Sequence, residues 1–484
     1  MRPTSDFAGI KRFFGNISLA VLLNLLIKPG WVVVENVVQD RLGHAAFGTF
    51  TALYALTMVL AAVSDLGLTQ HTTKQVAVQP SFLPENFPTI LPLRGVLSAL
   101  FLGLMVILGW SIGYRGHTLT LLVVLGISLL LTQYAQFLRG AVQAHQHFNT
   151  DAWLSVFEKA LLLGLVLVLL PLGITLNNYV GARTVAAGFT FVLLYGLVSR
   201  LFGRVRWQLS RQRVGTVLRG SVPFALITLL YGINERIDMV MLERLSSARE
   251  AGYYAGAYRW VDAVMIYLWT VLPLFFAKFA HALHRRDEQR ELLWFGQRVA
   301  AVPLLLVCAF VLFRGEVLFW QYTNSTAAEL ARMTLCAKIL FLNVLVHGFF
   351  AIYSTLLTST SFERPVGWLV GLSSALNIAL NVWLLPEYGA LAGAANTLVC
   401  AVFVSGGYVW LVQRRARVAV PWGMIGRMAL AFALLCGAWY GLQTLRLHWL
   451  PESLLAAAVF ALLLLATGVV RGQELLALRR KPAA

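Results

Sequence analysis

Apolar stretches of about 20 residues recur along the whole chain, and this feature restricts the fold more than any other. A helix of that length spans the hydrocarbon core of a bilayer. Inside a bilayer every backbone polar group needs an internal partner, so these stretches are expected to be helices. The sequence therefore predicts an all-α integral membrane protein. Fourteen transmembrane helices are predicted, near 15–39, 45–66, 92–113, 118–138, 152–172, 178–199, 220–242, 250–277, 294–313, 333–358, 366–385, 389–412, 424–444 and 450–470.

The distribution of charge gives these spans an orientation. Only 12% of the 484 residues are charged, whereas soluble domains carry roughly 25%. Most Lys and Arg residues outside the spans or near their ends fall on one side, with Arg94 assigned to that side and Arg183 to the other. Positive residues accumulate in cytoplasmic loops, so both termini are predicted to be cytoplasmic. The formal net charge of +18 is then explained by topology, and no nucleic-acid partner is expected.

Two segments of the chain match with nearly fixed spacing. Each has an acidic residue six positions before Arg-Leu, followed by Gly-x-aromatic-x-x-x-Tyr; the members are Glu35, Arg41, Gly48, Phe50, Tyr54 and Asp238, Arg244, Gly252, Tyr254, Tyr258. Parallel six-helix repeats predict two lobes related by a pseudo-two-fold axis along the membrane normal. The predicted divisions are an N-lobe at 1–199, a cytoplasmic linker at 200–219, a C-lobe at 220–412, and a segment with helices 13 and 14 and the tail at 413–484.

The first predicted span carries polar groups that lipid would not tolerate. Asn24, Lys28, Trp31 and Glu35 are spaced four, three and four residues apart, which places them on one helical face. A Pro-Gly pair directly after Lys28 predicts a bend at that point. Charged residues within spans normally face a bundle interior or a water-filled cavity.

Further span charges are Lys159, Arg236, Arg259 and Asp262. Together with Lys28 they suggest a cavity with cationic groups, which suits an anionic ligand such as a phosphate. The alternative is that these charges pair with one another and only fix helix packing. That alternative weighs most for Lys159, because a lysine near a helix end can extend to the interface.

A group of amides marks helices 11 and 12. Asn377 and Asn381 lie one turn apart, and Asn396 and Thr397 follow in the next span. Their oxygens could hold a small hard cation. Alternatively, the asparagines join helices by hydrogen bonds, as amides do in membranes, and the residues alone favour this packing role.

Three segments carry a resemblance to a known family. "RLGHAAFGTFTALYALTMVLAAVSDLGL" at 41–68, "INERIDMVMLERLSSAREAGYYAGAYR" at 233–259 and "LLPEYGALAGAANTLV" at 384–399 resemble the helix 1–2, 7–8 and 11–12 signatures of the polysaccharide flippases. These belong to the multidrug/oligosaccharidyl-lipid/polysaccharide exporter superfamily, which also contains the lipid II flippases. Order, spacing and helix number agree over nearly the whole chain.

The resemblance implies transport of an undecaprenyl-diphosphate-linked oligosaccharide from the cytoplasmic to the periplasmic leaflet by alternating access. It implies a bacterial inner-membrane location and, as partners, membrane lipids and glycan assembly enzymes. A cationic cavity would take the diphosphate-sugar head, and a groove beside helices 13 and 14 would take the lipid tail. Lys28 and Arg259 could match basic residues that line the cavity in lipid II flippases.

Some relatives bind sodium between helices 7, 11 and 12, and the resemblance places Asp238, Asn377, Asn381 and Thr397 where such ligands would lie. This chain has Asn381 where an acid would be expected. Sodium, a proton or the membrane potential therefore remain open as the driving force, and no other cofactor is implied.

Two other function classes are weighed against the flippase. A drug or metabolite antiporter of the same superfamily would usually have 12 helices and an acidic cavity, which helices 13–14 and the span cations oppose. A membrane glycan polymerase or ligase would need a sizeable outer loop, and the longest one found, at 314–332, has no useful catalytic pair. No GxxxxGK[ST] motif occurs, so no P-loop ATP site is encoded.

Overall fold

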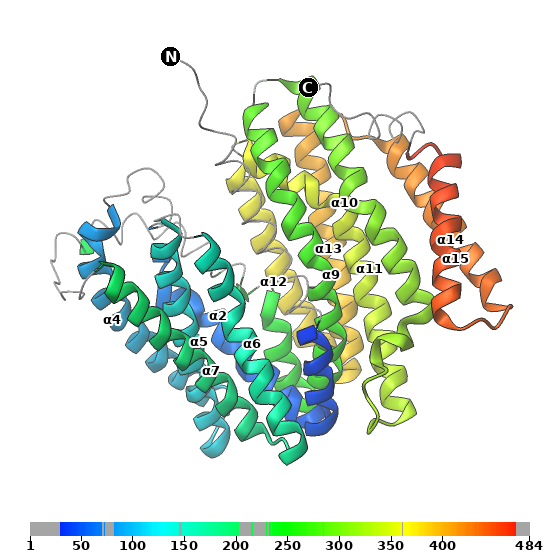
Figure 1. Cartoon of the computed structure of the whole chain (residues 1–484). Coiled ribbons are helices and arrows are strands. Elements are labelled where there is room, and N and C mark those ends of the chain that lie inside the picture. Colours follow the sequence, from blue (N-terminus) through cyan, green and yellow to red (C-terminus); the bar gives the residue numbers. More distant parts are fainter. Residues whose placement is uncertain are drawn as a thin grey trace. The chain divides into compact units, whose positions relative to one another are not determined.

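The structure is a computed structural model in which helices account for nearly all of the described backbone. It describes residues 30–69, 72, 82–144, 148–202, 214–215, 229, 232–233, 235–283, 285–360 and 362–470. Within these ranges there is no β-strand. Figure 1 shows long helices running side by side, as the prediction of an all-α membrane protein requires.

The first compact unit comprises residues 1–252. Its helices are α2 (His44–Asp65), α4 (Phe82–Ser111), α5 (Gly116–Ala144), α6 (Phe148–Leu172) and α7 (Leu176–Phe202). Helical segments at 30–42 and 235–245 complete the described part of this unit. Helix α5 packs against α2, α4, α6 and α7, so it is the central helix of the unit (Figure 1).

The second compact unit comprises residues 253–484. Its helices are α9 (Ala248–His281, which begins in the first unit), α10 (Arg286–Arg314), η1 (Gly315–Phe319), α11 (Ala327–Ser359), α12 (Glu363–Tyr388), α13 (Ala390–Leu411), η2 (Val412–Ala416), α14 (Trp422–Gln443) and α15 (Trp449–Ala466). Helix α11 is central, because it packs extensively on both α10 and α13.

Local sequence explains where two of these helices begin. Thr326 accepts a hydrogen bond from the Glu329 backbone N–H, and Glu329 accepts one from the Thr326 backbone N–H at 2.9 Å. This reciprocal capping satisfies two donors that a helix start leaves unpaired. Between α12 and α13, Gly389 has a φ of 61°, a conformation that favours glycine, and the chain reverses there into an antiparallel hairpin.

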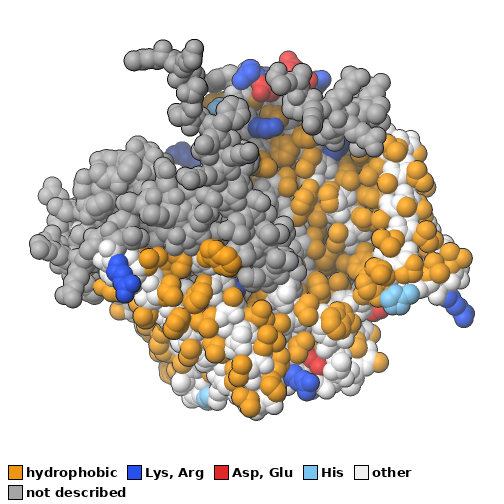
Figure 2. Space-filling model, viewed as in Figure 1, with side chains coloured by type: hydrophobic (Ala, Val, Ile, Leu, Met, Phe, Trp, Pro, Cys, Tyr) orange, Lys and Arg blue, Asp and Glu red, His pale blue; other side chains and the backbone are white. Residues whose placement is uncertain are grey.

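Eleven helices in the described ranges are long and apolar enough to cross a membrane. Each coincides with a predicted span, and the space-filling view shows hydrophobic side chains covering the outer surface of the helices (Figure 2). The protein is therefore a multi-pass membrane protein. Helix α6 covers the predicted span at 152–172. The spans at 15–39 and 220–242 lie largely outside the described residues, so the count of fourteen and the two-lobe symmetry stay predictions.

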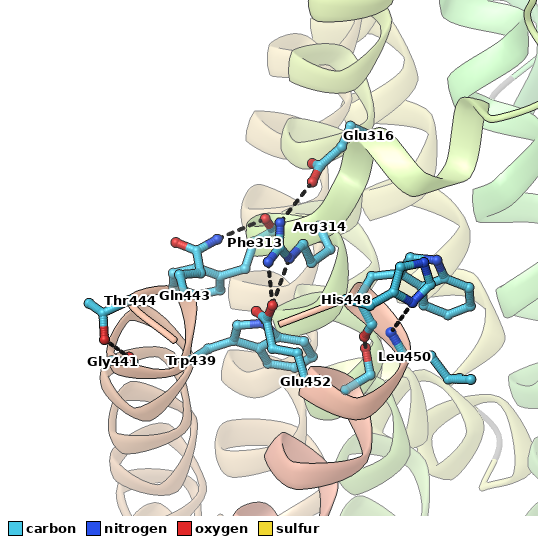
Figure 3. A network of polar contacts seen from close by, with 12 residues as sticks. Phe313, Arg314, Glu316, Trp439, Gly441, Gln443, Thr444, His448, Leu450 and Glu452 are labelled. Carbon is cyan, nitrogen blue, oxygen red and sulfur yellow. Dashed lines mark hydrogen bonds and ion pairs between the residues drawn. The ribbon is translucent and has the colours of Figure 1, made fainter. Parts of the chain in front are cut away.

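A buried ionic contact joins the last two helices to α10 (Figure 3). The Glu452 carboxylate of α15 is fully buried and pairs with the Arg314 guanidinium at the end of α10. Its second oxygen accepts a hydrogen bond from the Trp439 indole of α14 at 2.6 Å. Trp439 also stacks on Phe313. One carboxylate thus connects three helices where α14 and α15 meet the rest of the unit.

Candidate functional site

A buried ion pair lies inside the first unit between Glu35 and Arg183. Arg183 Nη1 is 3.5 Å from Glu35 Oε1, and the two side chains are 15% and 16% exposed. The Tyr179 hydroxyl donates to the same carboxylate oxygen at 3.1 Å. Arg183 and Tyr179 lie one turn apart on α7, so a single face of that helix holds the Glu35 carboxylate.

Aromatic rings surround the Arg183 guanidinium. Its Cζ atom lies 4.7 Å from the centre of the Tyr54 ring and 5.4 Å from that of Phe50, both on α2. The ring of Trp31, one turn before Glu35, is 6.0 Å away. Cation–π contact stabilises a guanidinium that is largely removed from water. Trp31 and Glu35 therefore share one helical face, as their spacing predicts, and that face is directed at Arg183.

Arg183 is the residue of this site that sequence reasoning missed. We had assigned it to the outer side of the membrane as a topology marker, although it lies in the second turn of α7. A usable signal existed: Gly181-Ala182-Arg183 resembles Gly393-Ala394-Ala395 of the 11–12 signature. Position 183 thus carries a cation where the similar segment has Ala395.

Arg94 is a second buried cation that was counted only as a loop charge. It lies on α4 with 2% exposure, and its Nη2 is 2.9 Å from Asp65 Oδ1 at the end of α2. Thr69 bridges the pair, accepting from Arg94 at 3.1 Å and donating to Asp65 at 2.6 Å. The guanidinium also lies over the Phe137 ring. With every partner satisfied, this cluster fixes the packing of α2 against α4.

The remaining predicted substrate residues are distributed over several elements. Asn24 and Lys28 lie outside the described residues. Lys159 is exposed on α6, Arg236 is half-buried in the helix at 235–245, and Arg259 is buried on α9 with Asp262 half-buried one turn later. Glu35 is the predicted substrate residue that lies in the Arg183 cluster.

In the second unit, three asparagines form a buried chain of hydrogen bonds. Asn381 Nδ2 donates to Asn377 Oδ1 at 3.1 Å within α12, and Asn396 Nδ2 of α13 donates to Asn381 Oδ1 at 2.9 Å. Two of the three amide oxygens are thus engaged with neighbouring amides. This geometry matches the packing role for the asparagines and joins α12 to α13.

The aromatic pairs of the internal repeat have similar geometry. The Phe50 and Tyr54 rings are stacked at 5.9 Å, and the Tyr254 and Tyr258 rings are stacked at 5.5 Å. The Tyr254 hydroxyl lies 3.2 Å from Thr397 Oγ1, which itself donates to the Gly393 carbonyl at 2.8 Å. The first pair thus adjoins a charged group, and the second adjoins a neutral one.

The end of the repeat motif in the helix at 235–245 is held by a separate contact. The Tyr114 hydroxyl donates to Glu243 Oε2 at 2.9 Å, and Glu243 also pairs with Arg244. Burial, together with the neighbouring carboxylate, raises the pKa of the Tyr114 phenol, so it remains a protonated donor. The contact attaches the loop between α4 and α5 to the segment that leads into α9.

No group of three or more His, Cys, Asp or Glu side chains is arranged to hold a metal ion in the part of the chain that the structure describes. The predicted sodium ligands fall in both compact units, with Asp238 in the first and Asn377, Asn381 and Thr397 in the second. Sodium binding at these residues stays a prediction.

Comparison with known proteins supplies the family. The sequence model of the polysaccharide biosynthesis protein family matches residues 14–276, more than half of the chain. The protein belongs to this family. It is also similar to an uncharacterized membrane protein of Methanocaldococcus jannaschii, with 21% identity over 416 residues that cover 80% of this chain and 95% of the relative.

Two solved structures share the fold. The lipid II flippase MurJ, in an inward closed conformation, matches with a TM-score of 0.77 and 10% identity, covering 95% of this chain and 99% of that one. A multidrug resistance MATE family transporter of the MOP superfamily, in an inward-facing conformation, matches with a TM-score of 0.64 and 14% identity, covering 82% of this chain and 97% of the other. The superfamily fold predicted from the sequence signatures is confirmed.

Proposed function

We propose that the protein moves an undecaprenyl-diphosphate-linked oligosaccharide from the cytoplasmic to the outer leaflet by alternating access. The observation that carries this proposal is Arg183, a largely buried guanidinium within an apolar helix, paired with Glu35 and surrounded by aromatic rings. A guanidinium binds phosphate oxygens in a bidentate manner. The flat faces of the neighbouring rings suit the C–H faces of sugars.

Glu35 has a specific role in this proposal. A lone charge within a membrane span is strongly unfavourable, and the carboxylate neutralises Arg183 while no substrate is bound. A diphosphate that reaches Arg183 would replace Glu35 as the anionic partner. The exchange of one anion for another keeps the guanidinium paired in both states. Substrate binding therefore leaves Arg183 with an anionic partner throughout.

The family and the extra helices support the same proposal. Membership of the polysaccharide biosynthesis family indicates a glycan-related task. The likeness to the lipid II flippase extends over 95% of the chain, whereas the likeness to the multidrug transporter extends over 82%. Helices α14 and α15 coincide with the predicted helices 13 and 14, which an antiporter would usually lack. An antiporter for cationic drugs is the second candidate, and the Arg183 cluster opposes it.

Replacing Arg183 tests the proposal. In proteoliposomes with a fluorescent diphosphate-linked oligosaccharide, Arg183→Ala is expected to slow flipping by roughly tenfold or more, because a charge-assisted contact is lost. Arg183→Lys keeps the charge but loses the planar fork, so an intermediate rate is expected. Arg286→Ala, at an exposed position on α10, serves as the matched control and should flip at the normal rate.

The alanine variant also leaves Glu35 buried beside no cation, which by itself could reduce the folded yield. The double variant Arg183→Gln with Glu35→Gln removes both charges, and we expect it to fold normally but to flip slowly. Normal flipping by this double variant would contradict the assignment of Arg183. Sodium- or proton-driven export of a cationic drug, with no glycan flipping by the wild type, would identify an antiporter instead.

We further propose that sodium is the coupling ion to test first, at Asp238, Asn377, Asn381 and Thr397. If it binds there, replacing external sodium by potassium should slow flipping in proteoliposomes, and Asn381→Asp should increase the sodium affinity. A rate that does not respond to sodium in either protein would leave the amide chain with a packing role alone. A proton gradient or the membrane potential would then be imposed in turn.

A further inference from the structure

A groove lies between α12 and α13 at the end of the hairpin opposite Gly389. Its volume is about 390 Å³, within the range of roughly 300–1,000 Å³ typical of pockets that hold small ligands. The groove is lined by Trp368, Leu369 and Leu372 of α12, Gly407 and Trp410 of α13, and Arg415 of η2. It is an apolar channel with a cation at one end.

Gly407 sets the width of this groove. A Cβ atom at this position would lie 2.3 Å from a terminal methyl carbon of Leu369, so the leucine side chain occupies the space that the glycine leaves. The preceding residue differs, because a Cβ at Gly406 would meet no atom within 4 Å. Any side chain at position 407 would therefore push Leu369 into the groove, and one at 406 would not.

The two tryptophans mark the depth of the groove in the membrane. Trp368 is 82% exposed and Trp410 is 54% exposed, and both lie within two turns of the helix ends. Exposed tryptophan is enriched where hydrocarbon meets the headgroups. The groove thus begins at the interface and runs toward the hydrocarbon, which is the path of an acyl chain.

Charge complementarity selects the headgroup. Arg415 is exposed and makes no ion pair within the described part of the chain. Arg364, Arg414 and Arg417 are also exposed at this end of the hairpin, and Glu363 is the one acidic residue that α12, α13 and η2 carry there. The positive-inside distribution places this end in the cytoplasm, where the leaflet carries anionic lipids.

A second apolar groove, which lacks a cation, serves as a comparison for the role of Arg415. The channel of about 330 Å³ between α9 and α11 is lined by Trp269, Leu272, Pro273, Phe276 and Thr355, with no charged group. It offers the same apolar contact to any lipid tail and nothing to a headgroup. Of these two grooves, the one between α12 and α13 combines an apolar channel with a cation.

We propose that the α12–α13 groove is a binding site for an anionic glycerophospholipid of the cytoplasmic leaflet. One acyl chain lies between Trp368 and Gly407, and the phosphate contacts Arg415. The site is separate from the transported glycan, so it would hold even if the proposed substrate proved wrong. Its occupant would keep the start of α12 and the end of α13 together.

Native mass spectrometry of the purified full chain tests this site, with phosphatidylglycerol and phosphatidylcholine supplied in equal amounts. The wild type should retain phosphatidylglycerol preferentially. A cation near an anionic surface contributes about 1 kcal/mol, so Arg415→Ala should weaken that retention roughly fivefold. Gly407→Ala should weaken it by narrowing the channel, whereas Gly406→Ala should retain lipid like the wild type.

Phe276→Ala, in the uncharged groove, is a second control and should leave phosphatidylglycerol retention unchanged. Equal retention of the two lipids by the wild type would overturn the proposal, as would unchanged retention in Arg415→Ala and Gly407→Ala. Displacement of the phosphatidylglycerol by an equal amount of a polyprenyl phosphate would also overturn it, because the groove would then belong to the transported lipid. Size-exclusion profiles establish that each variant is folded.

Discussion

Replacement of Arg314 by alanine is expected to lower the free energy of unfolding by about 3–5 kcal/mol, the cost of leaving one partner of a buried ion pair uncompensated. Glu452 has no exposed surface, and without Arg314 the Trp439 indole would be the donor left to it in the part of the chain that the structure describes. The consequence is loss of the contact between α10 and the α14–α15 pair. Thermal unfolding of the purified protein in detergent, followed by tryptophan fluorescence, measures the effect.

Glu316 provides the control for this experiment. It is 55% exposed and lies 3.7 Å from the same guanidinium, so Glu316→Gln should change the melting temperature little. The double variant Arg314→Met with Glu452→Leu removes both charges and is expected to recover much of the lost stability. If Arg314→Ala melted like the wild type, the ionic contact would not hold these helices.

Gly48→Ala is expected to prevent normal packing of α2. A Cβ at Gly48 would lie 1.7 Å from the backbone oxygen of Ala248, and one at Gly252 would lie 2.1 Å from the oxygen of His44. Backbone atoms cannot rotate away as a side chain can, so the two segments must separate. Overpacking typically costs 1–3 kcal/mol or more, and the separation would also break the 2.7 Å hydrogen bond from Gln39 to the Gly252 carbonyl.

The yield of folded, monodisperse protein is the measurement for Gly48→Ala and Gly252→Ala. Gly95→Ala and Gly103→Ala are the matched controls, since a Cβ at either of these α4 positions meets no atom within 4 Å. We expect normal yields from the controls and a large loss from the two repeat glycines. Equal yields from all four variants would show that the contact can relax without cost.

The spacing of Trp31 and Glu35 is the part of the candidate site that the sequence predicted. Residues four apart lie on one helical face, and in the structure both face Arg183. The repeat drew attention to Gly48, Gly252, Phe50–Tyr54 and Tyr254–Tyr258, but it was read only as a sign of two lobes. The close backbone contacts of the two glycines and the stacking of the two aromatic pairs are findings of the structure.

The charge partners were not predictable in the same way. The sequence singled out Glu35 as a residue that lipid would not tolerate, but it did not identify Arg183, which lies 148 residues away. Similarly, the sequence assigns Arg94 and Arg314 to the two sides of the membrane as ordinary loop cations. In the structure Arg94 pairs with Asp65, and Arg314 pairs with Glu452. A charge near a span end has the same appearance in sequence whether it faces the aqueous phase or a buried carboxylate.

By itself the sequence determined that this is a helical membrane protein, where most of its spans lie and which superfamily fold it adopts. Those properties depend on the length of the apolar segments, on the asymmetry of charge between loops and on the local spacing of residues. All three can be measured directly on the sequence. Only the tertiary structure decided that Arg183 belongs to the Glu35 site, that the asparagines bond to one another, and that Arg415 ends an apolar groove. Each of these depends on which helix faces meet, because pairing between distant segments is set by packing of the whole unit.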